Sequence, residues 1–160
     1  MRQAAYSPAQ RRRVVLVGAV FPLVLAAAGA ILLLEWAPRL PSDIVVQWSG
    51  DSPSTVQPLV VVTVAGLLVP LIAGAIAIVA TLSLTDDAGR HRGRLYIALG
   101  VAVATAVTVA LVAAVGLQLD GAATTGPEVG RRVLLGVAVA VPAAALAFLL
   151  TPPASRVPSK

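Results

Sequence analysis

The chain has 160 residues, of which 58% are hydrophobic and only 12% are charged. Soluble globular domains carry about twice that fraction of charged residues, so this composition argues against an ordinary soluble enzyme or binding domain. The formal net charge is +5, and the absence of Cys excludes a disulfide framework and thiolate chemistry. The composition therefore predicts a protein of the membrane.

Four apolar runs free of Asp, Glu, Lys and Arg account for the hydrophobic excess: residues 14–34, 59–84, 95–119 and 133–150. A helix rises about 1.5 Å per residue, so each run is long enough to cross a hydrocarbon core roughly 30 Å thick. One charge at mid-membrane would cost roughly 2.5–3.5 kcal/mol on the insertion scale, which makes clean runs informative. We predict an all-α membrane protein, with a four-helix transmembrane domain over 14–150 between an N-terminal segment at 1–13 and a disordered tail at 151–160.

The first run has a second interpretation, a cleaved signal peptide. Arg11, Arg12 and Arg13 would form its basic region, and the small residues of 26–30 would offer a cleavage site. The apolar run continues past that site to residue 34, which favours a membrane span. Cleavage would leave three spans.

The basic residues are distributed unevenly around these runs. Nine of the twelve Lys and Arg residues flank one side of a four-span arrangement, and three flank the other. The positive-inside rule then places both termini and the 85–94 connection in the cytoplasm, and the connections 35–58 and 120–132 outside. Basic clusters beside spans usually lie among anionic lipid head groups, so the expected partner is the lipid bilayer and not nucleic acid. Eleven Arg against one Lys, with abundant Ala, Val and Gly, suggest a bacterial cell membrane.

The chain carries little chemistry for catalysis. Its spans contain scattered hydroxyls but almost none of the carboxylates, amides or imidazoles that line proton and ion paths. The single His, His91, lies in a basic connection without a second type of metal ligand nearby, so a solvated loop residue is the expected role. Nucleophile elbows, phosphate loops and zinc motifs are absent from the sequence. We expect no enzymatic activity, no metal and no cofactor.

The third run contains a row of small residues spaced by four: Ala98, Ala102, Ala106, Ala110 and Ala114. Small side chains let two helix backbones approach closely, which is how helices associate in lipid. The row could pack against another helix of the same chain, or it could form an interface in a homo-oligomer. Packing within the chain is the simpler interpretation, because a four-span protein needs an innermost helix.

The segment 40–51, LPSDIVVQWSGD, differs from its apolar surroundings. Ile44, Val46 and Trp48 alternate with other residues in the period of two that is typical of a strand, so we predict a short extracytoplasmic β segment over 43–49 with these three on one apolar face. An isolated strand is marginally stable, so it needs a partner. The other outer segment, 118–130, is the expected neighbour. The alternative is a plain interfacial loop anchored by two Trp residues.

This arrangement of a span, an aromatic exit and a Leu-Pro motif resembles the membrane domain that opens the SdpI-type immunity proteins of bacteria. The resemblance covers about residues 14–55, and its matching residues are Leu40, Pro41, Ile44 and Trp48, with Gly50 and Asp51 standing for the family's Gly-acid turn. Two features depart from the family pattern. Gln47 replaces the usual His, which removes a titrating imidazole, and the Gly of the turn comes early.

The resemblance implies a small integral membrane protein that is not an enzyme. Immunity members protect the producing cell from a secreted toxic peptide, and some also sequester a cytoplasmic repressor. A peptide or a membrane protein is accordingly the expected partner. The rival hypothesis is a structural or accessory subunit of a larger membrane complex that presents the small-residue row. The candidate binding residues are Trp36, Leu40, Pro41, Ile44, Gln47, Trp48, Gly50 and Asp51.

Overall fold

The computed structural model describes residues 4–49, 52–83, 89–121, 124–153 and 155–156. Four of its helical segments are long and apolar enough to cross a membrane, which confirms the predicted number of candidate spans. The first segment is continuous from α1 through the π-helical turn η1 into α2 and the 3₁₀ turn η2. The helical elements are α1 (Pro8–Val15), η1 (Leu16–Val20), α2 (Phe21–Trp36), η2 (Ala37–Arg39), α3 (Leu59–Ser83), α4 (Gly89–Gly116), η3 (Leu119–Gly121) and α5 (Gly126–Leu150).

Three of the four spanning helical segments begin before their uncharged runs, and only α3 begins with its run, at Leu59. The first starts at Pro8 and the last at Gly126, several residues before the runs at 14 and 133. At both starts a capping box satisfies free backbone N–H groups, formed by Ser7 with Gln10 and by Thr125 with Glu128. Absence of charge marks the part of a helix suited to hydrocarbon, whereas Arg is a good helix former and continues the helix beyond it.

The first span contains a π-helical turn just before Pro22. Proline has no backbone N–H, so it cannot bond to the carbonyl one turn earlier. The backbone of α3 comes very close here, because a Cβ added to Gly74 would lie 2.6 Å from the Gly18 carbonyl oxygen and 3.2 Å from Cγ of Pro22. A side chain at Gly74 would therefore push α3 away from the first span.

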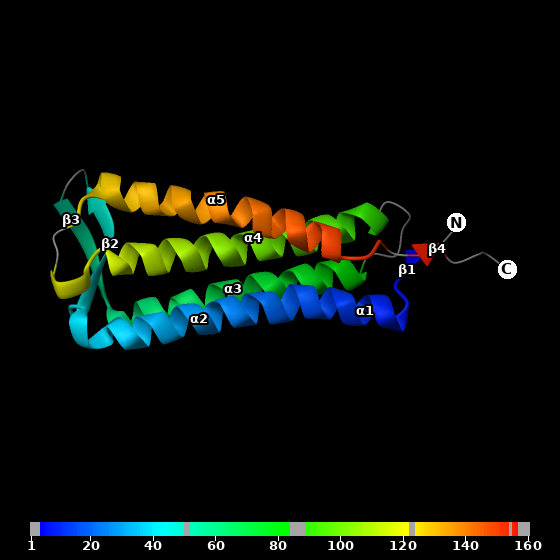
Figure 1. Ribbon diagram of the computed structural model, residues 1–160, viewed down its shortest axis with the longest axis horizontal. Coiled ribbons are helices and arrows are strands. Elements are labelled where there is room, and N and C mark those ends of the chain that lie inside the picture. The colour runs from blue at the N-terminus through cyan, green and yellow to red at the C-terminus, as the bar shows by residue number, and fades with distance from the viewer. Residues whose placement is uncertain (1–3, 50–51, 84–88, 122–123, 154, 157–160) are drawn as a thin grey trace.

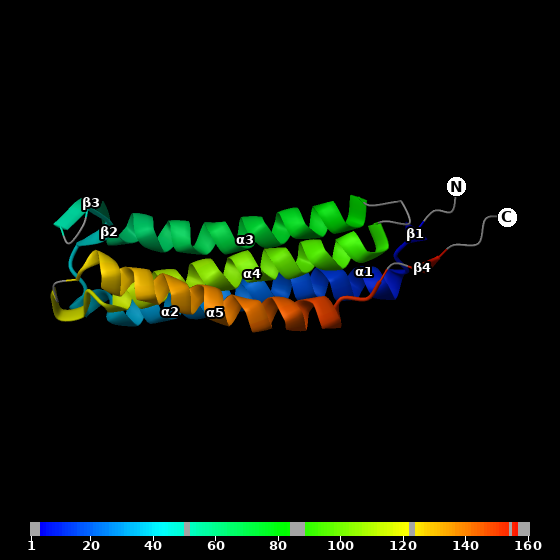
Figure 2. The same ribbon diagram turned by 90° about the horizontal axis from the view of Figure 1, so that it is seen from above.

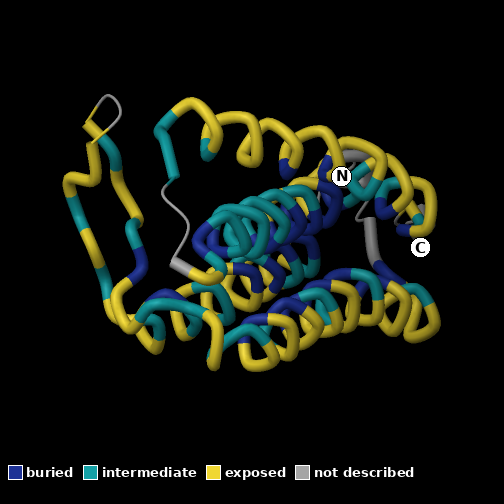
Figure 3. The backbone as a smooth tube through the Cα atoms, turned by 60° about the vertical axis from the view of Figure 1, so that its left-hand side comes forward, coloured by how far each residue is buried: buried dark blue, intermediate teal, exposed yellow. Residues whose placement is uncertain are grey.

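Helix α4 is the innermost of the four. It packs against α2, α3 and α5, whereas α5 packs chiefly against α4. In the most apolar window of each span, 39% of residues are buried in the α4 segment 92–116, compared with 17% in α3 and in α5. The ribbon views show α4 between its neighbours (Figures 1 and 2), and the burial view shows mostly yellow outer faces on the surrounding helices (Figure 3).

The small-residue row of α4 packs within the chain. A Cβ added to Gly136 of α5 would lie 2.7 Å from the Ala106 carbonyl oxygen and 3.1 Å from Cβ of Ala110. On another face of α4, a Cβ at Gly100 would lie 2.6 Å from Cβ of Ala77 in α3. Close backbone approach of this kind replaces the hydrophobic driving force that helices lack in lipid.

The two chain ends lie together at one end of the bundle (Figure 1). The strand β1 (Ala4–Ala5) pairs antiparallel with β4 (Ser155–Arg156). Gln10 Nε2 also donates to the Pro153 carbonyl oxygen at 3.0 Å. The structure thus differs from the expected disordered tail at these residues, because the tail finds hydrogen-bond partners in the N-terminal segment. Residues 154 and 157–160 lie outside the described part.

Arg94 fastens α4 to α5 near this end. Its Nε and Nη2 both donate to the Phe148 carbonyl oxygen, at 3.0 and 2.8 Å, and its guanidinium carbon lies 4.1 Å from the centre of the Phe148 ring. Carbonyls in the last turn of a helix lack partners within that helix. Arg94 therefore supplies hydrogen-bond donors to a carbonyl in the last turn of α5. The sequence alone shows it only as one residue of a basic cluster.

Candidate functional site

The end opposite the termini is closed by a structure that we call the hairpin cap: η2, the strands β2 (Asp43–Ser49) and β3 (Ser52–Pro58), and η3 (Figure 1). The strands pair antiparallel, from Asp43 with Pro58 to Ser49 with Ser52. The predicted strand is therefore confirmed. The expectation that it pairs with 118–130 is wrong, because a segment adjacent in the chain loses less entropy on pairing than a distant one.

An irregularity in β2 changes which side chains face the bundle. The register with β3 shifts between Val45 and Gln47, which leaves Val46 as an extra residue of β2. It shifts back between Gln47 and Trp48, which leaves Ser54 as an extra residue of β3. A β-bulge redirects the side chains that follow it. Ile44 is 1% exposed, but Val46 is 37% exposed. The single apolar face expected for Ile44, Val46 and Trp48 is thus broken at the bulge.

Ile44 anchors the cap to the bundle. Its side chain belongs to a buried cluster with Leu33 of α2, Val62 of α3 and Val115 of α4. Burying a side chain of this size stabilises the folded state by about 1.5–3 kcal/mol relative to exposing it. The partly buried hydrophobic residues packed around this cluster are Trp36, Leu40, Leu59 and Leu111.

Gln118 joins β2 to the end of α4 by hydrogen bonds. Its Oε1 accepts from the Val45 N–H at 2.9 Å, and its Nε2 donates to the Val45 carbonyl oxygen at 3.0 Å. A primary amide presents a donor and an acceptor side by side, as a neighbouring strand does. Gln118 is only 4% exposed. The segment after α4 is therefore a neighbour of β2, as expected, but through a side chain and not through strand pairing.

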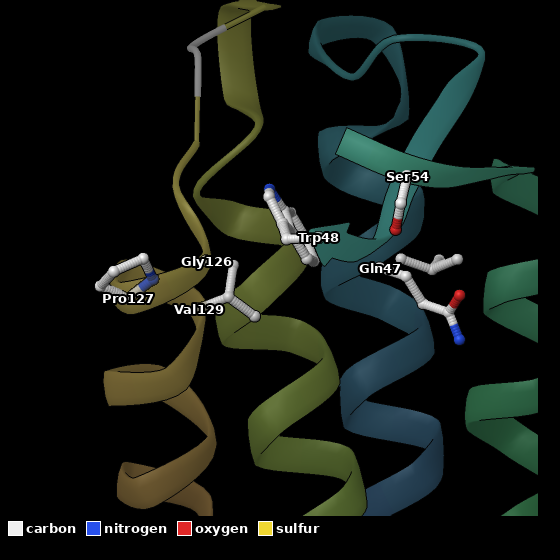
Figure 4. Close-up of a pocket in the computed structure, with 7 residues that line it drawn as sticks. Gln47, Trp48, Ser54, Gly126, Pro127 and Val129 are labelled. Carbon is white, nitrogen blue, oxygen red and sulfur yellow. The ribbon is translucent and has the colours of Figure 1, made fainter. Parts of the chain in front are cut away.

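Trp48 fixes the cap to the connection before α5. Its indole Nε1 donates to the Thr124 carbonyl oxygen at 3.2 Å. In the close-up the Trp48 ring is directed toward the start of α5, whereas the Gln47 side chain is directed away from it (Figure 4). Gln47 is exposed, and its Oε1 accepts from the Thr55 hydroxyl at 2.8 Å.

An exposed ion pair joins η2 to η3. Arg39 donates from Nε to one Asp120 oxygen at 3.0 Å and from Nη2 to the other at 2.5 Å. Asp120 has a positive φ of 59°, a conformation that Asp adopts more readily than most residues. The hydrogen bond from Arg39 lowers the pKa of the Asp120 carboxyl. Because both groups are exposed, the pair contributes little energy and serves chiefly to orient the two turns.

A hollow of about 560 Å³ lies between the cap and the start of α5 (Figure 4). This volume falls within the roughly 300–1,000 Å³ of small-molecule sites. The hollow combines a hydroxyl and an indole with the first turn of α5, which suits a ligand with both polar and apolar parts. Its lining residues are Val46, Gln47, Trp48, Ser54, Gly126, Pro127 and Val129.

The predicted binding residues divide into two groups. Trp36, Leu40 and Ile44 face the bundle and hold the cap, and Pro41 is half-buried beside them. Gln47 and Trp48 line the hollow. The predicted turn residues Gly50 and Asp51 lie outside the described residues, as do residues 85–88 of the 85–94 connection.

Sequence reasoning missed the contributions of Ser54, Gly126, Pro127 and Val129, and it did not assign Gln118 a role. A signal for Gln118 exists, because it is an amide in the last turn of an otherwise apolar run. The described residues contain no group of three or more His, Cys, Asp or Glu side chains that could hold a metal ion. The site can therefore offer hydrogen bonds and apolar contacts.

Comparison with models of protein families, with curated proteins and with solved structures finds no match to this chain. The family resemblance therefore rests on the motif residues of the cap.

Proposed function

We propose that this chain is a binding protein of the bacterial cell membrane, related to the SdpI-type immunity proteins, whose hairpin cap recognises a secreted peptide at the outer surface. The observation that carries the proposal is the hollow beside Trp48. Ile44, Gln118 and Trp48 each fasten β2 to a different part of the bundle, so the walls of the hollow are preorganised. Preorganised walls reduce the entropy cost of binding.

A strand edge adds a second means of recognition. The strand β3 pairs with β2 along one edge, and no described strand pairs with the other. Such an edge can accept an extended peptide as a further strand. Val56 is 53% exposed on β3, and Ser54 lines the hollow. A peptide bound along β3 would therefore reach the hollow with its side chains.

The proposed orientation places both termini in the cytoplasm and the cap outside. The distribution of basic residues supports it, and the two termini lie at one end of the bundle, as an even number of spans requires (Figure 1). Cysteines at Ser52 and Thr124 should react with a membrane-impermeant reagent in intact cells, whereas one at Ala88 should not. Labelling of Ala88→Cys from outside would show that the orientation is the opposite one.

A growth assay tests the immunity role. Conditioned medium from the parent strain should inhibit a strain in which this gene is deleted, and the intact gene should restore growth. Ser54→Arg should fail to restore it, because a long charged side chain would occupy the hollow. Ser49→Arg is the matched control, since Ser49 is an exposed cap residue outside the hollow. Equal growth with and without the gene would reject the immunity role.

Photocrosslinking in native membranes distinguishes binding by the cap from the subunit hypothesis. A crosslinker at Gln47 should give a discrete adduct, whereas one at Val79, which is 68% exposed on α3, should give only lipid adducts. The subunit hypothesis relied on the small-residue row of α4, and Ala106 and Ala110 of that row already contact α5. A stable stoichiometric adduct at Val79 and none at Gln47 would favour a subunit.

A further inference from the structure

An apolar groove of about 320 Å³ lies beneath the hairpin cap. Helix α4 forms its floor, and α3 and α5 form its walls because both pack against α4 and not closely against each other. The floor is wide because Ala110 and Ala114 are small. The groove is bounded by Val107, Ala110 and Ala114 of α4, Val62 of α3, Val133 of α5 and Trp48 of the cap.

The groove is apolar, and this limits the kinds of molecule that can occupy it. No ionisable side chain lines it, and its one amide, Gln118, is committed to both backbone groups of Val45. Water in a cavity needs two to four polar partners, and an enclosed apolar cavity of about 150 Å³ stays dry. Hydrocarbon can therefore fill this groove, whereas water or a charged ligand cannot do so without a penalty.

The surroundings of the groove indicate where that hydrocarbon comes from. On α3, Val61 and Val64 beside the groove are 48% and 47% exposed, and on α5 Leu134 and Val137 are 68% and 51% exposed. Outward apolar faces of spanning helices contact acyl chains. The groove between them is thus open toward the hydrocarbon layer, which supplies acyl chains at high local concentration.

A cation beside the groove suits the head group of a phospholipid. Val46, Trp48 and Val129 border both the groove and the polar hollow, so apolar and polar compartments are continuous. Arg132 is exposed on α5 next to Val133 of the groove, whereas Arg131, about 200° around the helix from Val129, lies on the opposite side of α5. Cations at the head-group level attract anionic lipids by about 1 kcal/mol each.

From these observations we infer that the groove is a lipid site, in which one acyl chain of an anionic phospholipid lies between α3 and α5 under Trp48 while its head group contacts Arg132. The inference goes beyond the proposed function and does not depend on it, since it requires only that the helices span a bilayer. The bound chain supports the hairpin cap from below and completes the packing between α3 and α5.

Fluorescence quenching by brominated lipid tests the site. The full chain carrying Trp36→Phe, which leaves Trp48 as its sole Trp, is reconstituted in vesicles with an increasing fraction of phosphatidylglycerol brominated along its acyl chains. Quenching should saturate at a low fraction of brominated lipid. Val133→Phe should weaken this binding about tenfold, because overpacking typically costs 1–3 kcal/mol and about 1.4 kcal/mol is a factor of ten. Leu134→Phe is the matched control and should leave the curve unchanged.

Three results would overturn the inference. Quenching that rises in proportion to the brominated fraction, and equally in all three proteins, would show only the general lipid contact of a membrane helix. Absence of quenching together with a crosslinked dimer through Val133 would assign the groove to a second copy of the chain. Equal affinity for brominated phosphatidylcholine, or no loss of affinity in Arg132→Gln, would overturn the assigned head-group contact.

Discussion

Replacing Gln118 by Ala should release the hairpin cap from the bundle. The substitution removes the two hydrogen bonds that Gln118 makes to the Val45 N–H and carbonyl. These backbone groups then lack those partners, and they lie next to position 118, which is buried. A buried polar group left unsatisfied costs about 1–3 kcal/mol, so the two together should cost about 2–4 kcal/mol once water reaches part of the opening. The cap should open locally while the helices stay folded, because the helices keep their own backbone bonds.

Hydrogen exchange measures this opening directly. The backbone amide of Val45 should exchange about 30-fold to several hundred-fold faster in the variant, since about 1.4 kcal/mol is a factor of ten. Gln47→Ala is the matched control, because that exposed amide bonds only to Thr55 among the interactions described, and exchange at Val45 should stay near the wild-type rate. Gln118→Glu should fall between the wild type and Gln118→Ala, since a carboxylate still accepts from the Val45 N–H but cannot donate to the Val45 carbonyl.

Unchanged protection of residues 43–49 in Gln118→Ala would refute the reasoning. It would mean that Ile44 and the pairing of β2 with β3 hold the cap without Gln118. Fast exchange throughout 40–49 in the wild type would refute it more generally, because the cap would then be a free loop.

Three further predictions concern the packing and charges around the bundle. Gly136→Leu should lower stability by about 1–3 kcal/mol in thermal unfolding, because its side chain forces α5 away from α4. Gly130→Ala is the control and should be neutral or slightly stabilising, because a Cβ at Gly130 meets nothing within 4 Å. Arg94→Lys should lower the unfolding temperature, because it loses the two hydrogen bonds to the Phe148 carbonyl and the contact with the Phe148 ring. Arg92→Lys, at an exposed position, is the control and should leave the unfolding temperature unchanged. Because the pKa of Asp120 is lowered, its ion pair contributes above the ordinary pKa of an aspartate and is lost as the pH falls through the lowered value. Acid should therefore free η3 from η2 while the rest of the cap stays folded. A small change in Trp48 fluorescence, measured in a Trp36→Phe background, should report it, and Asp120→Asn should show no such transition.

The helices could be predicted because each depends mainly on its own residues. A run of apolar residues long enough to span hydrocarbon predicts a helix whatever its neighbours are. The helix ends were predicted less well, since the capping residues Ser7 and Thr125 lie outside the uncharged runs. The strand at 43–49 was also predictable, because its alternation is local.

The candidate site could be predicted only in part. The sequence singled out Gln47 and Trp48, both of which line the hollow. It could not separate them from Ile44, because the bulge in β2 breaks the alternation on which that separation would depend. It could not separate them from Trp36 and Leu40 either, which precede the strand and face the bundle only once the helices have packed.

By itself, then, the sequence determined four apolar helices and one polar segment between the first two, because hydrophobicity and turn chemistry act over a few residues. Only the tertiary structure decided what that segment does. Gln118 lies 73 residues from Val45 in the chain, and Trp48 lies 76 residues from Thr124. Contacts over such separations form only after the helices have packed, because the packed helices bring the end of α4 and the start of α5 to the hairpin. The hollow and the lipid groove result from that packing, in which α3 and α5 lie on either side of α4.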